Sequence, residues 1–341
     1  MVLAFHFFSR WAPPIYSKNI YPYEFEIPKH VSQYGYLGVQ LFFMISGFVI
    51  LRTLETRNNL KSFFIARLKR ILPSLWLAIL LIYLICNALN QNFLAPIPRS
   101  SIIPSSTLIS PYILNHIFET NFIWTTGVLW SLLVEIQFYF LAAILFFSLK
   151  RINFPIKIFL IAAISEIAEI VSLFSNETNK FFDLVFPITN YIWWFVAGLI
   201  FYEISKNQKK IYLKIILGIS FLVNLSSVNI GAHGIRQQLI TSVIVTTFYF
   251  LFSLIISNSR LVNFLRSKWL FWMGGLTYEF YLIHESIGVS ILSWFSEIYG
   301  NTFPSNLSIL VLLAIIGILL STSYLLKRLS QALLHLAERI K

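Results

Sequence analysis

The chain has 341 residues, of which 57% are hydrophobic and only 12% are charged, whereas about a quarter of the residues in a soluble domain are charged. So few charged side chains cannot cover a water-exposed surface, which excludes an ordinary soluble enzyme or binding module. The net charge of +12 would suit a nucleic-acid partner, but the basic residues gather between long apolar segments. That arrangement is typical of a polytopic membrane protein, so we expect an all-α membrane protein and no nucleic-acid partner.

Apolar segments recur along the whole chain and predict about ten transmembrane helices. The first segment is too short for a full crossing because Pro13 and Pro14 end it, so we expect a truncated first helix. The N-terminus also lacks the pattern of a cleavable signal peptide. No linker or repeat divides the sequence, so we expect one membrane domain over residues 1–341. The expected spans lie near residues 1–13, 35–51, 72–90, 129–149, 154–174, 184–203, 211–227, 237–257, 271–293 and 306–326.

The basic residues are divided unequally between the two sides of the membrane that these spans define. Most of the 26 lie on one side, in clusters within residues 52–70, 150–157, 206–214, 260–268 and 327–341. The positive-inside rule places that side in the cytoplasm, together with both termini.

The longest external connection, residues 91–128, contains several prolines and aromatic residues. Long connections are often functional but need not be. The composition therefore fits either a cap on the membrane surface, which could shape an acceptor site, or a loosely ordered loop.

Ionisable side chains inside the expected spans are the main candidates for chemistry, because a charge is costly in a bilayer unless it faces protein or water. Ser131 and Glu135 share one helical face, and in the ninth span Thr277, Tyr281 and His284 form one polar stripe. Any single group is explained equally well by a structural hydrogen bond between helices. The full set comprises His6, Glu135, Glu166, Glu169, Glu279, His284 and Glu285.

A basic run precedes the third span and contains Arg67 and Arg70, which face the same way if the segment is helical. Two guanidinium groups in register suit phosphate binding. Basic residues in this position also set topology and touch lipid head groups, so the phosphate interpretation needs support from elsewhere in the chain. Cys86, the only cysteine, lies within the third span and is expected to serve packing; we predict neither a disulfide nor a metal site.

Together these segments resemble the acyltransferase-3 family of membrane acyltransferases. The resemblance spans nearly the whole chain, and its most specific part is the glycine-rich motif of the second span that contains Ser46-Gly47-Phe48. Family members usually have a longer first helix, with an arginine that would precede Met1 here, and the chain is similar to the stand-alone members without a fused esterase-like domain. The segments that carry the resemblance are His6, Gly35–Phe48, Arg67–Pro73, Trp130–Tyr139 and Tyr278–His284.

This resemblance implies a membrane-bound O-acyltransferase of the bacterial inner membrane. The implied donor is cytoplasmic acyl-CoA, most often acetyl-CoA, and the implied acceptor is a hydroxyl of an envelope carbohydrate or lipid-linked glycan, such as a polysaccharide or lipopolysaccharide. The matching positions make His6, Glu135 and His284 the catalytic candidates and Arg67 and Arg70 the residues that bind the donor.

Two questions of function remain open at this point. A transporter of a small acid or lipid-linked sugar would also use buried carboxylates and histidines, although the sequence shows no inverted repeat. For acyl transfer, histidine is the natural general base, and we expect His6 in this role with Glu135 or His284 orienting it. We favour direct transfer in a ternary complex over an acyl-histidine intermediate, because the covalent route requires a second, deacylation step.

Overall fold

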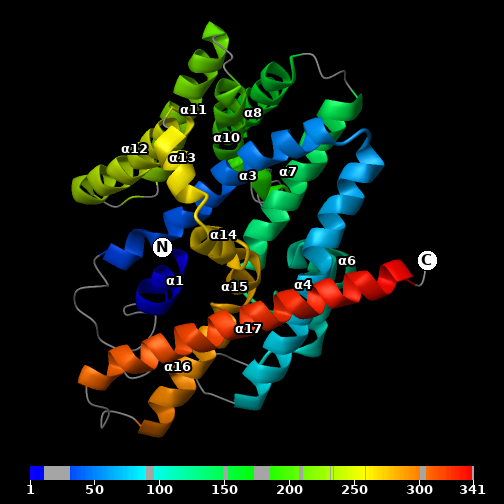
Figure 1. Ribbon diagram of the computed structural model, residues 1–341, viewed down its shortest axis with the longest axis vertical. Coiled ribbons are helices and arrows are strands. Elements are labelled where there is room, and N and C mark those ends of the chain that lie inside the picture. Colours follow the sequence, from blue (N-terminus) through cyan, green and yellow to red (C-terminus); the bar gives the residue numbers. More distant parts are fainter. Residues whose placement is uncertain are drawn as a thin grey trace. The chain divides into compact units, whose positions relative to one another are not determined.

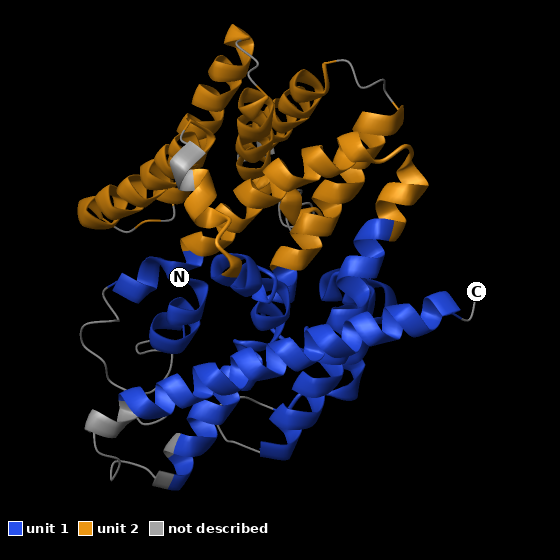
Figure 2. Cartoon of the chain, in the orientation of Figure 1, with its two compact units in different colours: residues 1–36, 66–130, 269–341 blue, residues 37–65, 131–268 orange. Residues whose placement is uncertain are grey.

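The computed structural model describes residues 1–10, 31–89, 96–148, 153–172, 185–206, 210–230, 232, 234–257, 259–299 and 305–339. Within these residues the chain is helical and contains no strand, which confirms the expected all-α class (Figure 1). Packing divides the chain into two compact units (Figure 2). Unit 1 contains residues Met1–Tyr36, Ala66–Trp130 and Trp269–Lys341, and unit 2 contains residues Leu37–Ile65 and Ser131–Lys268.

Among the described residues, six helices are long and apolar enough to cross a membrane by length and composition. They coincide with expected spans and are Gln33–Thr56, Leu60–Leu89, Leu129–Ser148, Ile211–Ile230, Ile235–Ser257 and Ile309–Arg339. Two shorter apolar helices, Ile192–Ser205 and Ser286–Phe295, correspond to parts of two further expected spans. The first expected span begins with α1 (Val2–Phe5) and η1 (His6–Arg10), and its last residues, 11–13, lie outside the described part of the chain.

Unit 2 is built around α10 (Ile192–Ser205), whose residues are buried along most of its length. This helix packs against α3, α8, α11 and α12. An apolar helix surrounded on all sides by others forms the core of a bundle, because it has no face to turn outward. These four helices are α3 (Gly38–Thr56), α8 (Phe154–Ser172), α11 (Ile211–Ile230) and α12 (Ile235–Ser257). From α7 (Leu129–Ser148), Phe138 stacks on Phe195 of α10.

Two glycines allow α3 and α10 to approach closely. A Cβ atom added at Gly47 would lie 2.2 Å from the carbonyl oxygen of Phe195, and one at Gly198 would lie 1.8 Å from the carbonyl oxygen of Met44. Such distances are far below van der Waals contact, so only glycine fits at either position. Small residues at helix crossings are a general feature of membrane proteins, and here they explain the glycine of the Ser46-Gly47-Phe48 motif.

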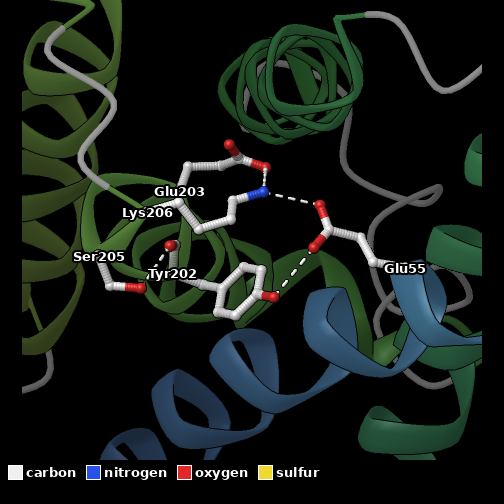
Figure 3. Close-up of polar contacts among 5 residues, drawn as sticks. All are labelled: Glu55, Tyr202, Glu203, Ser205 and Lys206. Atoms are coloured by element: carbon white, nitrogen blue, oxygen red, sulfur yellow. Dashed lines mark hydrogen bonds and ion pairs between the residues drawn. The ribbon is translucent and has the colours of Figure 1, made fainter.

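A polar cluster joins the ends of the same two helices (Figure 3). Nζ of Lys206, at the end of α10, lies 2.7 Å from Glu55 and 3.0 Å from Glu203, and the Tyr202 hydroxyl donates to Glu55 at 2.9 Å. Burial lowers the pKa of Lys206, but its hydrogen bonds and charge interactions with the two carboxylates outweigh burial and raise the pKa above its usual value. Lys206 thus remains charged and holds both helix ends.

Unit 1 contains most of α4 (Leu60–Leu89), together with the first helix and the C-terminal helices. Residues 96–128 are structured rather than loose, because they form η3 (Arg99–Ser101), α5 (Ile102–Thr107) and α6 (Pro111–Phe118). Asn87 ties the start of this connection to α4 through two hydrogen bonds with the backbone of Ile97. The described part of the connection is therefore anchored to α4 at its beginning.

The expected continuous span at residues 271–293 is wrong, because the chain is interrupted twice there. The segment consists of α14 (Lys268–Gly274), α15 (Thr277–Ile283) and α16 (Ser286–Tyr299). The first break follows Gly274 and Gly275, which weaken a helix, and Nζ of Lys327 from α17 (Ser305–Arg339) donates to the carbonyl of Gly275 at 2.7 Å. The second break lies at His284 and Glu285. Interrupted helices at membrane depth are tolerated where protein surrounds them.

Substituting either crossing glycine should loosen unit 2. We expect Gly47→Ala and Gly198→Ala each to destabilise the protein by about 1–3 kcal/mol, because the added methyl group overlaps a backbone carbonyl. Gly218→Ala in α11 is the matched control, since a Cβ there meets no atom within 4 Å, and it should be neutral or slightly stabilising. Thermal unfolding of the detergent-solubilised variants measures the difference; equal midpoints for Gly47→Ala and Gly218→Ala would contradict the close crossing.

Candidate active site

An ionisable pair lies in the interior of unit 1 and joins the first helix to the second break of the ninth span. Nδ1 of His6 lies 3.0 Å from Oε1 of Glu285, and the two side chains are 12% and 5% exposed. In such surroundings an interaction between charged or polar groups is stronger than at a water-exposed surface. His6 begins the π-helical turn η1, and turns of this kind are frequent at functional sites.

His284 lies beside this pair. Its ring is edge-on to that of His6, with 5.1 Å between the centroids, and the residue is 1% exposed. Nδ1 of His284 is 2.8 Å from the carbonyl oxygen of Tyr281, and because a carbonyl can only accept, this contact places a proton on Nδ1. In the neutral imidazole Nε2 is then an acceptor, and no group in the described part of the chain hydrogen-bonds to it.

The contact between His284 and Tyr281 also accounts for the break in the helix. In a continuous helix the carbonyl of Tyr281 would accept a hydrogen bond from the amide of residue 285. The imidazole competes for that carbonyl, as side chains do when they bond to nearby backbone groups. The interruption therefore follows from the same side chain that lies next to His6.

The end of the connection before α7 fixes the carboxylate of Glu285. The Thr126 hydroxyl donates to Oε2 of Glu285 at 3.4 Å, and a Cβ atom added at Gly127 would lie 2.8 Å from that same oxygen. A side chain at residue 127 would consequently displace the carboxylate. On the opposite helix, Phe7 reaches so close to Gly288 that a Cβ there would meet the ring at 2.5 Å, so η1 is seated directly on α16.

The two candidate arginines both lie within α4, as the expected helical spacing required. They differ in environment: Arg67 is buried, with 5% of its surface exposed, and Arg70 is exposed. The Tyr278 hydroxyl donates to the carbonyl of Ile71 at 3.1 Å, so α15 packs against α4 one turn beyond Arg67. An anion at this position would meet one arginine at the surface and one beneath it.

Glu135 lies in unit 2, where it connects two helices. Its Oε1 accepts a hydrogen bond from Ser46 at 2.7 Å and a short one from Tyr139. Since Ser46 belongs to the glycine-rich motif of α3, these contacts join that motif to the segment Trp130–Tyr139 of α7. Hydrogen bonds of this kind hold membrane helices together. A catalytic role for Glu135 stays a prediction.

The sequence places Glu285 among the ionisable residues of the expected spans but does not single it out as a site residue. The available signal was its position, since it directly follows His284 inside an apolar span, where an ionisable group needs a partner. The sequence alone does not identify His6 as the partner of Glu285. Among the described residues, no group of three or more His, Cys, Asp and Glu residues is arranged to hold a metal ion.

Comparison with known proteins adds an independent finding to this geometry. No curated protein and no solved structure matches the chain. A family model described as an acyltransferase domain, that of the acyltransferase-3 family, matches residues 1–328. This match covers nearly the whole sequence, including both histidines, Glu285 and the arginine pair. The chain is therefore a member of the acyltransferase-3 family.

Proposed function

We propose that this protein transfers an acyl group, most simply acetyl, from cytoplasmic acyl-CoA to a hydroxyl of an envelope carbohydrate or lipid-linked glycan. The family supports acyl transfer in general. The observation that carries the proposal is the buried contact of 3.0 Å between His6 and Glu285. Beside it lies Nε2 of His284, to which no described residue hydrogen-bonds. A carboxylate beside a histidine orients the ring and stabilises the imidazolium, which suits the histidine to act as a general base.

In the proposed reaction, His6 activates the acceptor. Nδ1 of His6 lies 3.0 Å from the carboxylate of Glu285, which favours the proton on Nδ1 and leaves Nε2 as the proton acceptor. Nε2 removes the hydroxyl proton as the oxygen attacks the thioester carbon, so a carbon–oxygen bond forms and the carbon–sulfur bond breaks. His6 then returns the proton to the departing thiolate, which leaves as coenzyme A. The carboxylate of Glu285 stabilises the imidazolium that exists between the two proton transfers.

Direct transfer suits the groups present. Cys86, the single cysteine, is buried and contacts Ser290 and the backbone of Ser286, so it has the environment of a packing residue. His284 offers a second acceptor nitrogen, which we assign to hydrogen bonding with the acceptor substrate. A ternary complex of donor, acceptor and protein then needs one base and no covalent intermediate.

Arg67 and Arg70 supply the donor site in this proposal. Coenzyme A carries several phosphate groups, and planar guanidinium groups bind phosphate in a bidentate manner. Positive-inside counting assigns the start of α4 to the cytoplasmic side, where acyl-CoA is found. The buried position of Arg67 favours a strong interaction with phosphate, because charge interactions strengthen away from water.

Removal of the proposed base should abolish transfer without abolishing donor binding. We expect His6→Ala to lower kcat by about 10²–10⁴-fold, and Glu285→Gln to lower it by at least about 10²-fold with an altered pH profile, because the amide cannot stabilise an imidazolium. Cys86→Ala is the control and should keep its rate. The measurement is acetyl transfer from acetyl-CoA in membranes that contain the native glycans, followed by mass spectrometry. Retained transfer by both His6→Ala and His6→Gln would eliminate His6 as the base.

Loss of an arginine should weaken donor binding. We expect Arg67→Ala and Arg70→Ala to raise the Kd for acetyl-CoA by about tenfold or more, the loss typical of a hydrogen bond between charged groups. Lysine should restore little, because it lacks the planar fork. Arg57→Ala removes an exposed arginine from the same basic segment and serves as control. Titration of the solubilised protein tests this, and unchanged affinity in both variants would refute the assignment.

The sidedness of the membrane can be checked by thiol labelling. We predict that cysteines at Asn58 and Thr120, two exposed positions, react with impermeant reagents from opposite sides, because one lies in the basic segment and the other in the predicted external connection. The labelling uses a Cys86→Ala background. Reaction of both positions from the same side would show the proposed topology to be incorrect.

A further inference from the structure

Glu279 of α15 is a buried carboxylate that the reaction described above does not use. The residue is 5% exposed, and its Oε1 accepts a hydrogen bond from the Ser74 hydroxyl of α4 at 2.8 Å. Its other oxygen, Oε2, is buried and has no hydrogen-bond partner in the described part of the chain. A carboxylate oxygen without a partner is costly inside a protein, so a group from a ligand is a natural occupant of this position.

The position of Glu279 along the bundle indicates which ligand. On α4, Arg67 and Ser74 are seven residues apart and thus lie on one face, separated by roughly 10 Å along the axis. On α15, His284 follows Glu279 by five residues, or roughly 7 Å. Since Ser74 and Glu279 contact each other, Glu279 lies between the proposed phosphate site and the histidines.

Other contacts keep α4 alongside the interrupted ninth span in the same order. The Tyr278 hydroxyl meets Ile71 at 3.1 Å, and farther along both elements the Ser290 hydroxyl meets the sulfur of Cys86 at 3.4 Å. The separation of roughly 17 Å between the levels of Arg67 and His284 is comparable with the phosphopantetheine arm of coenzyme A. The arm contains about as many chain atoms as four residues of a polypeptide, so it spans roughly 14 Å when extended. The side chain of Arg67 is long enough to cover the remaining distance to the phosphate.

We propose that Glu279, held by Ser74, binds an amide N–H of the pantetheine arm of acyl-CoA. This inference rests on the proposed donor and adds a subsite to it. The carboxylate accepts a hydrogen bond from the amide N–H, which fixes the arm so that the thioester reaches the histidines. Glu279 is a binding residue here, since it touches the arm and not the reacting atoms.

The test compares ligands that differ in one amide. Titrations of the solubilised protein use coenzyme A and two analogues, in each of which one pantetheine amide is replaced by a hydrocarbon unit of the same length. One analogue should bind the wild-type protein as tightly as coenzyme A does. The analogue that lacks the contacted amide should bind about tenfold more weakly than coenzyme A, the typical loss of a hydrogen bond to a charged group. In Glu279→Leu the affinity for coenzyme A should fall by a similar factor, and the discrimination between these two ligands should disappear.

Two further variants make the result specific. Glu166→Leu removes another carboxylate from an expected span, one that accepts a hydrogen bond from Trp193 at 2.9 Å, and it should discriminate as the wild type does. Glu279→Asp withdraws the carboxylate by one methylene group while keeping the charge, so it should show reduced discrimination even if Glu279→Leu does not fold.

The possible failures separate the two proposals. If the wild-type protein binds no coenzyme A, the proposed donor is wrong. If it binds coenzyme A and both analogues equally, the donor stands and the Glu279 subsite is overturned. Equal weakening of all three ligands by Glu279→Asp would also overturn it, because that pattern indicates a structural role for the carboxylate.

Discussion

A lipid bilayer offers no water to an ionisable side chain, so each such group must find its partner inside the protein. In unit 1 this requirement brings His6 to Glu285 across the sequence, and in unit 2 it brings Ser46 and Tyr139 to Glu135. These contacts connect helices that apolar packing alone could arrange in several ways. The same requirement thus organises both units and determines which side chains are available for chemistry.

The need of ionisable side chains for partners inside the protein also affects the backbone of the ninth span. The ninth apolar segment is interrupted where His284 bonds to the carbonyl of Tyr281, and the interruption places Glu285 against Thr126 and Gly127. A continuous helix would have satisfied that carbonyl with a backbone amide. Exchanging one helical hydrogen bond for a side-chain contact is unfavourable for an isolated helix but gives two adjacent ionisable residues a defined geometry.

Membership of the acyltransferase-3 family and the geometry of unit 1 support the same chemistry from different directions. The family match concerns the whole chain and says nothing about individual side chains, whereas the contact between His6 and Glu285 says nothing about the substrate. Together they make a histidine base the simplest interpretation of the site. Arg67 and Glu279 are both buried and lie on elements that pack together, and they are the residues on which the proposed donor site rests.

The sequence by itself determined the all-α membrane class, most of the long spans and the candidate residues, because hydropathy and charge placement are read along a single chain. It also indicated the family, because the family motifs are recognised by their order along the chain and not by their contacts. Only the tertiary structure decided that Glu285 contacts His6, that Glu135 binds Ser46, and that the ninth span is broken. These facts depend on which helix faces meet, and a helix that is apolar all round does not specify in its own sequence which face will meet which neighbour.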